Sequence, residues 1–425
     1  MTMPDIQIKI NHFGPLRDVT IKWAPFIIIT GHSNLGKSYA NYLLYYVLSN
    51  LLGDGIVSLV QSKISETESS GSANLTYSEI NEYLDMNVQD YMRSFLGDDL
   101  LECDVNFKIR GNEDSFHYEY TKKVVDSPIK DLPKEISYYM VVNGHSYTYT
   151  ANDSFSPAFY FSYYTIQQLF GTSLIRTILL PPGRGAFVGE NYSIKDRVSS
   201  SVGMYREYFN DYDYSQGKDD EGEDNDDDRF VFDIISSLVG GHFVSEKSKQ
   251  YIILSTGDKL SLSAAASSIK EVSPLLFCFL NRNKYRYSYC LEEPEAHLHP
   301  KSQIIVADLI ANFLNKGSVF QITTHSDYFI QRVNQLIKLG DIRKADSGLY
   351  AQLSEERHLL MSSYIDRSLV KAYFFHKNDA GNVEVTEIPL TKDGISYNTF
   401  YDVTQDLNER EDYINDRLYS LEGKE

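Results

Sequence analysis

Runs of alternating and continuous hydrophobic residues open the chain. Residues 6–10 and 19–23 alternate apolar and polar side chains, which is typical of half-buried strands. Residues 26–29 are continuously apolar and predict a short buried strand, whereas residues 39–52 repeat apolar and aromatic side chains at helical spacing. The N-terminal segment therefore predicts three strands and then a helix, with a glycine-containing loop before the helix.

A second set of hydrophobic segments lies further along the chain. Residues 157–180 predict an aromatic-rich helix that leads into a strand, and residues 287–291 predict a short buried strand. A helix over residues 303–314 and a strand over residues 318–322 follow. Buried strands that alternate with helices predict an α/β fold.

Residues 53–151 differ in character from the segments on either side. Residues 62–74 are rich in Ser, Thr and Glu and are typical of a solvated connection, whereas residues 77–96 predict a helix. Alternating patterns over residues 116–120 and 136–142 predict strands. We therefore predict a small α+β arm inserted into the first half of the fold.

Four regions follow from these patterns. We predict the N-terminal half of the core at residues 1–52, the inserted arm at 53–151, the C-terminal half of the core at 152–346, and a C-terminal α/β extension at 347–425. The extension carries a few strands and ends in a charged helix over residues 405–421. An acidic run at residues 219–228 is typical of a solvated loop.

Composition narrows the function classes. The formal net charge of −19 over 425 residues disfavours nonspecific coating of nucleic acid by the whole surface. Cys103, Cys278 and Cys290 are widely spaced and predict free, buried thiols in a reducing compartment. The sequence contains no run of about 18 apolar residues and begins without a secretion-signal pattern. We expect a cytoplasmic protein with no membrane partner.

The loop before the first helix carries a phosphate-binding motif. Residues 31–38, GHSNLGKS, match the pattern G-x-x-x-x-G-K-[ST], whose backbone N–H groups surround a β-phosphate. The Lys37 ammonium is predicted to contact the β- and γ-phosphates, and the Ser38 hydroxyl to bind Mg²⁺. The predicted ATP-binding residues in this segment are Gly31, Asn34, Gly36, Lys37, Ser38 and Tyr39.

Two adjacent acids, Glu292 and Glu293, follow the predicted strand at residues 287–291. Adjacent carboxylates at a buried strand end are costly unless a cation or a reacting water uses them. In a P-loop enzyme the first acid binds the Mg²⁺ shell and the second polarises the attacking water, so we predict these roles for Glu292 and Glu293. His325, in a polar cluster that ends the strand at residues 318–322, is predicted to contact the γ-phosphate and to sense its loss.

The order of these motifs resembles a known family. The P-loop, then EEPEAHLHP at residues 292–300, then TTHSD at residues 323–327 is similar to the ABC-type ATPases of the SMC/RecF/OLD branch. The chain resembles more closely the stand-alone, OLD-like prokaryotic ATPases labelled AAA family, many of which are found in phage-defence operons. The ATPase subunit of PARIS-type defence systems is one such relative. The resemblance covers residues 6–52 and 260–400.

The resemblance implies an ABC-type P-loop core, in which helices flank a mixed sheet, and a nucleotide site that is split between two protomers. A serine ahead of a helix in the second protomer closes over the γ-phosphate in that family. Ser267 and Ser268 are the predicted residues for this role, with Ser263 as the alternative, although the usual glycine of the family is absent here. An ordinary serine-rich helix start is the other interpretation of this segment.

Two more residues take their interpretation from the resemblance. Glu292 stands where many relatives have Asp, and the longer side chain implies that water links it to Mg²⁺ and that hydrolysis is slow. Residues 179–185, LLPPGRG, are similar to the strand of the family that ends in Pro-x-x-Arg. Arg184 is therefore predicted to contact phosphate or a neighbouring protomer, or else to be a surface arginine in a Pro/Gly turn.

The resemblance implies an ATPase that acts as a nucleotide-gated switch. ATP is expected to drive a homodimer or a higher homo-oligomer, and the chain is expected to be the sensor or scaffold of an anti-phage system that controls a separate effector protein, such as a nuclease. The alternative is a RecF-like DNA-repair or recombination ATPase that loads on DNA, a partner that the net charge does not favour. A scaffold without turnover and a self-contained nuclease are two further alternatives.

Overall fold

The structure is a computed structural model. It describes residues 4–64, 69–111, 114–125, 135–152, 157–188, 203–215, 226–246, 249–281, 284–356, 363–396 and 398–422. The first part of the predicted acidic loop, residues 219–225, lies outside the described residues. Its last three residues begin helix α7 (Asp226–Val239).

A six-stranded sheet forms the centre of the molecule, in the order β16-β15-β3-β14-β13-β9. Its strands are β3 (Phe26–Gly31), β9 (Arg176–Leu180), β13 (Tyr287–Glu292), β14 (Val319–Thr323), β15 (Val370–Lys377) and β16 (Val383–Ile388). Every neighbouring pair is parallel except β15 and β16. All residues of β3 and β13 are buried, because helices cover both faces of the sheet.

The two faces of this sheet pack into two hydrophobic cores, because successive side chains of a strand point to opposite faces. Ile27 and Ile29 belong to one core, and Phe26 and Ile28 to the other. The helices of the first core are α1 (Lys37–Leu51), α2 (Asp54–Gln61), α3 (Tyr77–Leu96) and α4 (Pro157–Phe170).

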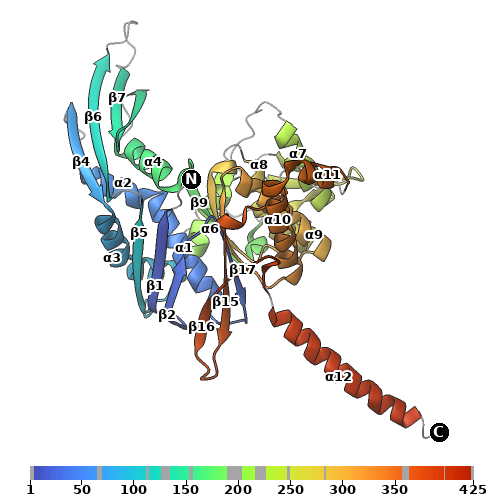
Figure 1. Ribbon diagram of the computed structural model, residues 1–425. Helices are drawn as coiled ribbons and strands as arrows, with labels where there is room; N and C mark the ends of the chain where they lie inside the picture. Colours follow the sequence, from blue (N-terminus) through green and yellow to red (C-terminus); the bar gives the residue numbers. More distant parts are fainter. Residues whose placement is uncertain are drawn as a thin grey trace.

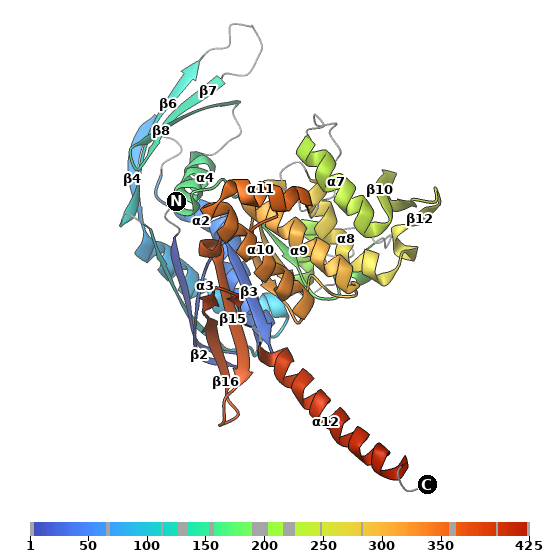
Figure 2. The same cartoon turned by 45° about the vertical axis from the view of Figure 1, so that its right-hand side comes forward.

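The helices of the second core gather on the other side of the sheet (Figures 1 and 2). They are α6 (Gly203–Ser215), α7, α8 (Ser267–Leu280), α9 (Pro300–Asn315), α10 (Asp327–Ala345) and α11 (Ser347–Glu356). A small sheet beside α7 contains β10 (Gly241–Glu246), β11 (Lys249–Leu254) and β12 (Lys259–Ser261). This arrangement confirms the predicted α/β fold with a mixed sheet and flanking helices.

Helix α3 shows how closely local signals determine an element. The Thr76 hydroxyl accepts a hydrogen bond from the Glu79 N–H, and the Glu79 carboxylate accepts one from the Thr76 N–H, which completes a capping box. Gly97 ends the helix in the left-handed conformation. The helix spans the residues predicted from periodicity.

The region predicted as an inserted arm is connected to the start of the chain by a second sheet. Strand β5 (Cys103–Arg110) pairs with β1 (Asp5–Phe13), which also pairs with β2 (Leu16–Lys22). A four-stranded sheet extends beyond it (Figure 1), made of β4 (Ser70–Thr76), β6 (Ser115–Val125), β7 (Glu135–Val142) and β8 (His145–Asn152). One continuous core includes both sheets, so the predicted boundary at residue 53 does not separate two cores.

The region predicted as a C-terminal extension differs more strongly from expectation. Strand β15 lies directly beside β3, with Ala372 opposite Ile28, and β16 forms the sheet edge. The carboxylate of Glu387 on β16 pairs with Lys371 at 2.5 Å. Residues 370–388 are therefore part of the central sheet, because the apolar side chains of β15 are buried against both cores. A short hairpin of β17 (Leu390–Thr391) and β18 (Gly394–Ile395) follows.

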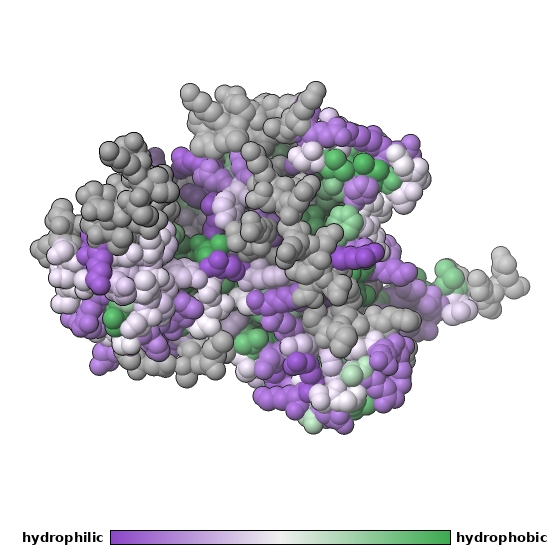
Figure 3. Space-filling view, turned by 90° about the horizontal axis from the view of Figure 1, so that it is seen from above, coloured by the Kyte–Doolittle hydropathy of each residue, from purple (hydrophilic) through white to green (hydrophobic). Residues whose placement is uncertain are grey.

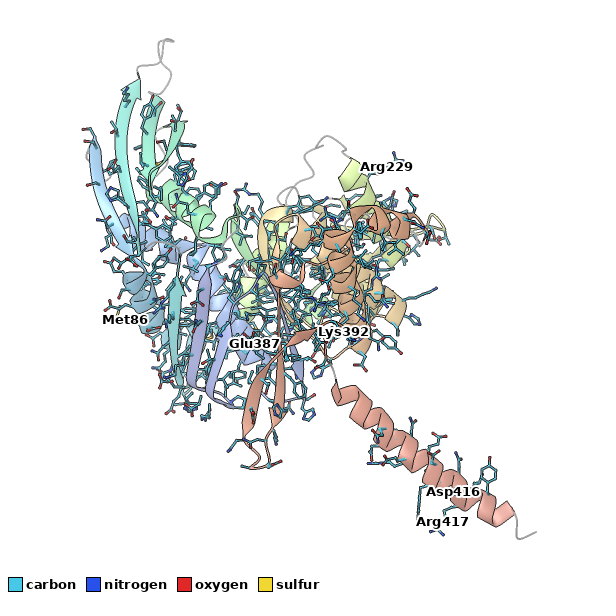
Figure 4. All side chains as sticks on the ribbon, viewed as in Figure 1. Met86, Arg229, Glu387, Lys392, Asp416 and Arg417 are labelled. Carbon is cyan, nitrogen blue, oxygen red and sulfur yellow. The ribbon has the colours of Figure 1, made fainter. Side chains whose placement is uncertain are left out.

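The last helix, α12 (Asn398–Glu422), projects away from the rest of the molecule (Figures 1 and 4). Its labelled side chains Asp416 and Arg417 extend from the helix, and Figure 3 shows hydrophobic side chains in separate groups among hydrophilic ones on the upper face. Among the described residues, no single helix is long and apolar enough to cross a membrane; α1 and α2 meet that test only together, across a bend of 41°.

The contact between β2 and β15 generates a stability prediction. The buried hydroxyl of Tyr373 accepts a hydrogen bond from the Lys22 N–H at 2.8 Å and donates one to the Lys22 carbonyl at 3.1 Å. We expect Tyr373→Phe to lower the free energy of unfolding by about 1–3 kcal/mol, because both backbone groups lose their partner in a part-buried place. Chemical denaturation measures this change. Tyr413→Phe, on the exposed face of α12, is the control, and equal stability of the two variants would contradict the assignment.

Candidate active site

The P-loop connects the carboxyl end of β3 to α1. Gly31, Asn34 and Gly36 all have positive φ angles, of 123°, 63° and 90°. A Cβ atom at Gly31 would lie 2.1 Å from the carbonyl oxygen of Phe375 on β15. The first glycine of the motif is therefore required by the neighbouring strand as well as by the turn. Tyr39, one of the predicted nucleotide contacts, packs edge-on against Phe13 with ring centroids 4.8 Å apart.

The ammonium of Lys37 folds back onto the loop that carries it. It donates hydrogen bonds to the carbonyl oxygens of Gly31 at 3.1 Å and His32 at 2.6 Å. Burial lowers the pKa of Lys37, and the charges of Glu292 and Glu293 oppose this shift. The positive charge therefore lies among the loop carbonyls, close to the two acids, where phosphate oxygens are the expected competing acceptors.

Glu292 is the most constrained of the acids. Its carboxylate is 2% exposed and accepts hydrogen bonds from the Ser38 hydroxyl and the Asn41 amide, each at 2.6 Å. Burial raises the pKa of Glu292, while these two hydrogen bonds oppose the shift. The predicted pair of metal-binding residues, Ser38 and Glu292, is thus in direct contact, and its oxygen atoms are of the kind that Mg²⁺ prefers.

Asn41 was not predicted from the sequence. It lies one helical turn after Ser38, so both side chains are on the same face of α1. The Asn41 side chain is fully buried, and its Oδ1 atom has no hydrogen-bond partner among the described residues. A single polar residue among the apolar and aromatic residues 39–48 was the available signal.

Glu293 has an unusual backbone conformation. Its φ angle is +44°, which is uncommon for a residue other than glycine. Its N–H donates to the Thr323 carbonyl of β14 at 3.0 Å, so the turn after β13 is fixed to the neighbouring strand. The side chain, unlike that of Glu292, is only half-buried. Glu293 is therefore the more accessible of the two acids, as its predicted role with water requires.

His325 is held beside the acids by a residue that sequence reasoning missed. The backbone N–H of His325 donates to the Glu295 carboxylate at 2.7 Å, and the Thr324 hydroxyl donates to the same oxygen at 2.8 Å. Burial raises the pKa of Glu295. Burial lowers the pKa of His325; the Lys37 charge lowers the His325 pKa further, and the Glu293 charge opposes this lowering. The third acid of EEPE, three residues after Glu292, was the available signal.

Arg184 requires a correction. It was predicted to contact phosphate or a partner protomer, or to be a surface arginine, but its side chain is fully buried. Its guanidinium donates to the carbonyl oxygens of Glu292 at 2.6 Å, Glu271 at 3.0 Å and Pro181 at 3.1 Å, and lies 3.6 Å from the Glu271 carboxylate. Burial lowers the pKa of Arg184, and Glu271 opposes that shift. With its donors directed to backbone, Arg184 is not a nucleotide ligand in this conformation.

The serines that were predicted to close over the nucleotide of a second protomer lie in and just before helix α8. Ser267 and Ser268 form the first turn of α8, where Ser267 is exposed and Ser268 half-buried. The alternative, Ser263, is exposed and its hydroxyl is 2.8 Å from that of Ser261. No described hydrogen bond joins these serines to the P-loop of the same chain. Their role toward a second protomer stays a prediction.

The parallel sheet explains which motifs meet. Strands β3, β14 and β13 are adjacent, and their carboxyl ends lie at one edge, where ligands of such sheets bind. This brings together residues from three distant segments of the sequence: Lys37, Ser38, Glu292, Glu293 and His325. The arrangement places a cation, a pair of oxygen-bearing side chains, an accessible carboxylate and a histidine around one loop that matches the phosphate-binding motif.

Residues 202–330 match the AAA ATPase domain. This region contains the two acids and His325, whereas the P-loop lies outside it. Comparison with curated protein sequences finds no match.

The chain is also similar in structure to SMC heads. The SmcHead bound to the C-winged helix domain of ScpA is 16% identical, with 91% of this chain and 98% of that chain covered and a TM-score of 0.38. The Smc head with an extended coiled coil, bound to the C-terminal domain of ScpA from Pyrococcus furiosus, is 13% identical, with 96% of this chain and 100% of that chain covered and a TM-score of 0.38. The SMC head domain from Thermotoga maritima is 11% identical, with 91% of this chain and 100% of that chain covered and a TM-score of 0.33. At these TM-scores we draw no functional conclusion from the similarity.

The position of Lys37 generates a binding prediction. We expect Lys37→Ala to weaken ATP binding by about 1.5–3 kcal/mol, roughly 10- to 150-fold in Kd, because a charged donor to phosphate is lost. Titration calorimetry with ATP and Mg²⁺ measures this difference. The control is Lys392→Ala, at an exposed position labelled in Figure 4. Unchanged affinity in Lys37→Ala would show that ATP does not bind at this loop.

The lowered pKa of His325 generates a pH prediction. As pH falls below about 6.5, the unfolded chain binds a proton at this residue before the folded chain does. This residue therefore makes the folded state less stable as pH falls from about 6.5 to its lowered pKa. We expect His325→Gln to remove that part of the pH dependence. Urea unfolding between about pH 5 and 7.5, compared with His297→Gln at an exposed position, tests it; parallel profiles would contradict it.

Proposed function

We propose that this chain is an ATPase that binds ATP and Mg²⁺ at the P-loop and hydrolyses ATP slowly. The observation that carries the proposal is the direct hydrogen bond between the P-loop hydroxyl of Ser38 and the buried carboxylate of Glu292, two residues 254 positions apart in sequence. Buried carboxylates are costly, and this one is placed where the motif expects the metal of a nucleotide complex. The match of residues 202–330 to the AAA ATPase domain supports the same activity.

Each residue of the site has a role in this proposal. Lys37 leaves the loop carbonyls for the phosphates, and Glu293 orders the attacking water. His325, uncharged at neutral pH because its pKa is lowered, accepts or donates a hydrogen bond near the γ-phosphate. Ser38 and Glu292 would hold Mg²⁺, directly or through water, and the ion would neutralise charge on the phosphates.

The biological role is proposed from the sequence resemblance. In this role ATP brings two protomers together through Ser267 or Ser268 of α8, and hydrolysis separates them, so that the nucleotide acts as a conformational switch. The switch controls a separate effector in an anti-phage system. Phage challenge of cells that express the chain with its neighbouring genes, with and without Lys37→Ala, tests this role. Hydrolysis that is strongly stimulated by DNA would favour the RecF-like alternative instead.

Replacement of Glu293 tests the central activity. We expect Glu293→Gln to reduce ATP turnover roughly 100-fold or more while ATP still binds, because the carboxylate that orders water is lost and the P-loop is intact. We also expect this variant to accumulate as an ATP-bound oligomer. Phosphate release and light scattering with ATP and Mg²⁺ measure the two effects.

The matched control is Glu411→Gln on the exposed face of α12, which is expected to behave like the natural chain. Turnover in Glu293→Gln equal to that of the natural chain would exclude Glu293 as the water-ordering residue. Absence of turnover in the natural chain would refute the ATPase proposal.

A further inference from the structure

Arg184 is a buried cation that the proposed chemistry does not use. It is the largest side chain that lies fully inside the described part of the protein, in the 3₁₀ helix η1 (Arg184–Phe187) after β9. A buried guanidinium is costly unless its donors are satisfied, and here they are satisfied mainly by backbone carbonyls. The residue therefore fixes the positions of the chain segments around it.

Two of these carbonyls belong to the acids of the site. Arg184 donates to the carbonyl of Glu292 at 2.6 Å and to that of Glu293 at 3.3 Å. The peptide group between Glu292 and Glu293 is also held at its N–H, which donates a hydrogen bond to the Thr323 carbonyl. Glu293 is thus held from both sides in a left-handed conformation, which costs roughly 1–3 kcal/mol and persists only where the surroundings enforce it. The direction of its carboxylate depends on this support.

The other side of Arg184 is attached to helix α8. The Glu271 carbonyl accepts from the Arg184 Nε atom at 3.0 Å, and the Glu271 carboxylate lies 3.6 Å from the guanidinium. The same carboxylate accepts a hydrogen bond from the Gly185 N–H at 2.9 Å. Glu271 is 4% exposed and follows Ser267 by one turn of the helix. A shift of the first turn of α8 therefore moves the groups that hold Arg184.

We propose that Arg184 and Glu271 are positioning residues that couple the first turn of α8 to the orientation of Glu293. The inference rests on the proposed function, in which that turn closes over the nucleotide of a second protomer. Closure over the partner's ATP then shifts Glu271 and Arg184, and with them the water-ordering carboxylate of the same chain. The consequence is that the two ATP sites of a dimer hydrolyse cooperatively.

The first measurement needs no turnover. Hydrogen–deuterium exchange of the nucleotide-free protein reports on the amides of Glu293 and Ala296, which are bonded to the Thr323 and Glu293 carbonyls. We expect Glu271→Gln to accelerate their exchange roughly tenfold or more, because the glutamine keeps an acceptor for Gly185 but loses the ion pair. The same exchange in Glu271→Gln as in the natural chain would overturn the coupling.

The second measurement separates positioning from binding. Arg184→Lys keeps the charge but loses the planar fork that reaches several carbonyls. We expect its kcat to fall about 10- to 100-fold, with the Kd for ATP unchanged within about threefold, and the Hill coefficient to approach one. Loss of ATP affinity at an unchanged kcat would instead make Arg184 a phosphate ligand and overturn the proposal.

The matched control is Arg332→Lys on α10. Arg332 is also buried and pairs with Asp308 on α9 at 2.7 Å, and no described hydrogen bond joins it to the two acids. If this variant loses as much kcat as Arg184→Lys at similar thermal stability, the role of Arg184 is only structural and the proposal is wrong. If the natural chain shows no turnover, the proposed ATPase function fails, and the exchange measurement alone decides whether α8 and Glu293 are coupled.

Discussion

The structure depends on the burial of one carboxylate at the end of a central strand. Glu292 lies where water cannot solvate its charge, and its stability there depends on hydrogen bonds from Ser38 and Asn41 of α1. These bonds fix the helix after the P-loop to strand β13, which comes from a distant part of the sequence. The P-loop, the central sheet and the turn that contains Glu293 are therefore positioned by a single costly group.

Burial deprives the charged groups of Lys37 and Glu292 of solvation by water. Burial lowers the pKa of Lys37 despite the charges of Glu292 and Glu293, and it raises the pKa of Glu292 despite the hydrogen bonds from Ser38 and Asn41. Lys37 compensates with the carbonyls of Gly31 and His32, which are weaker acceptors than phosphate oxygens. The free energy that is not recovered within the chain is available to favour a ligand with negative oxygens and a cation.

Local sequence patterns predicted the individual helices and strands of this fold better than the contacts that each residue makes in the folded chain. The pattern that predicted α3 is local, and it indicated the helix correctly. The P-loop, the paired acids and His325 lie at the ends of adjacent parallel strands, so motif order was enough to predict their proximity. Asn41, Glu295 and the burial of Arg184 were missed, because a polar residue is identified as buried only when the chain packed around it is known.

Strand β15 has a consequence for the synthesis of the protein. It completes the hydrogen bonding of the P-loop strand β3, and its Tyr373 bonds to a residue 351 positions earlier. While a ribosome is still making the middle of the chain, β3 has an unpaired edge made of four buried hydrophobic residues and a glycine-rich loop. The nascent chain therefore carries an exposed, aggregation-prone strand edge until β15 has emerged, and it is at this stage that a chaperone has most to protect.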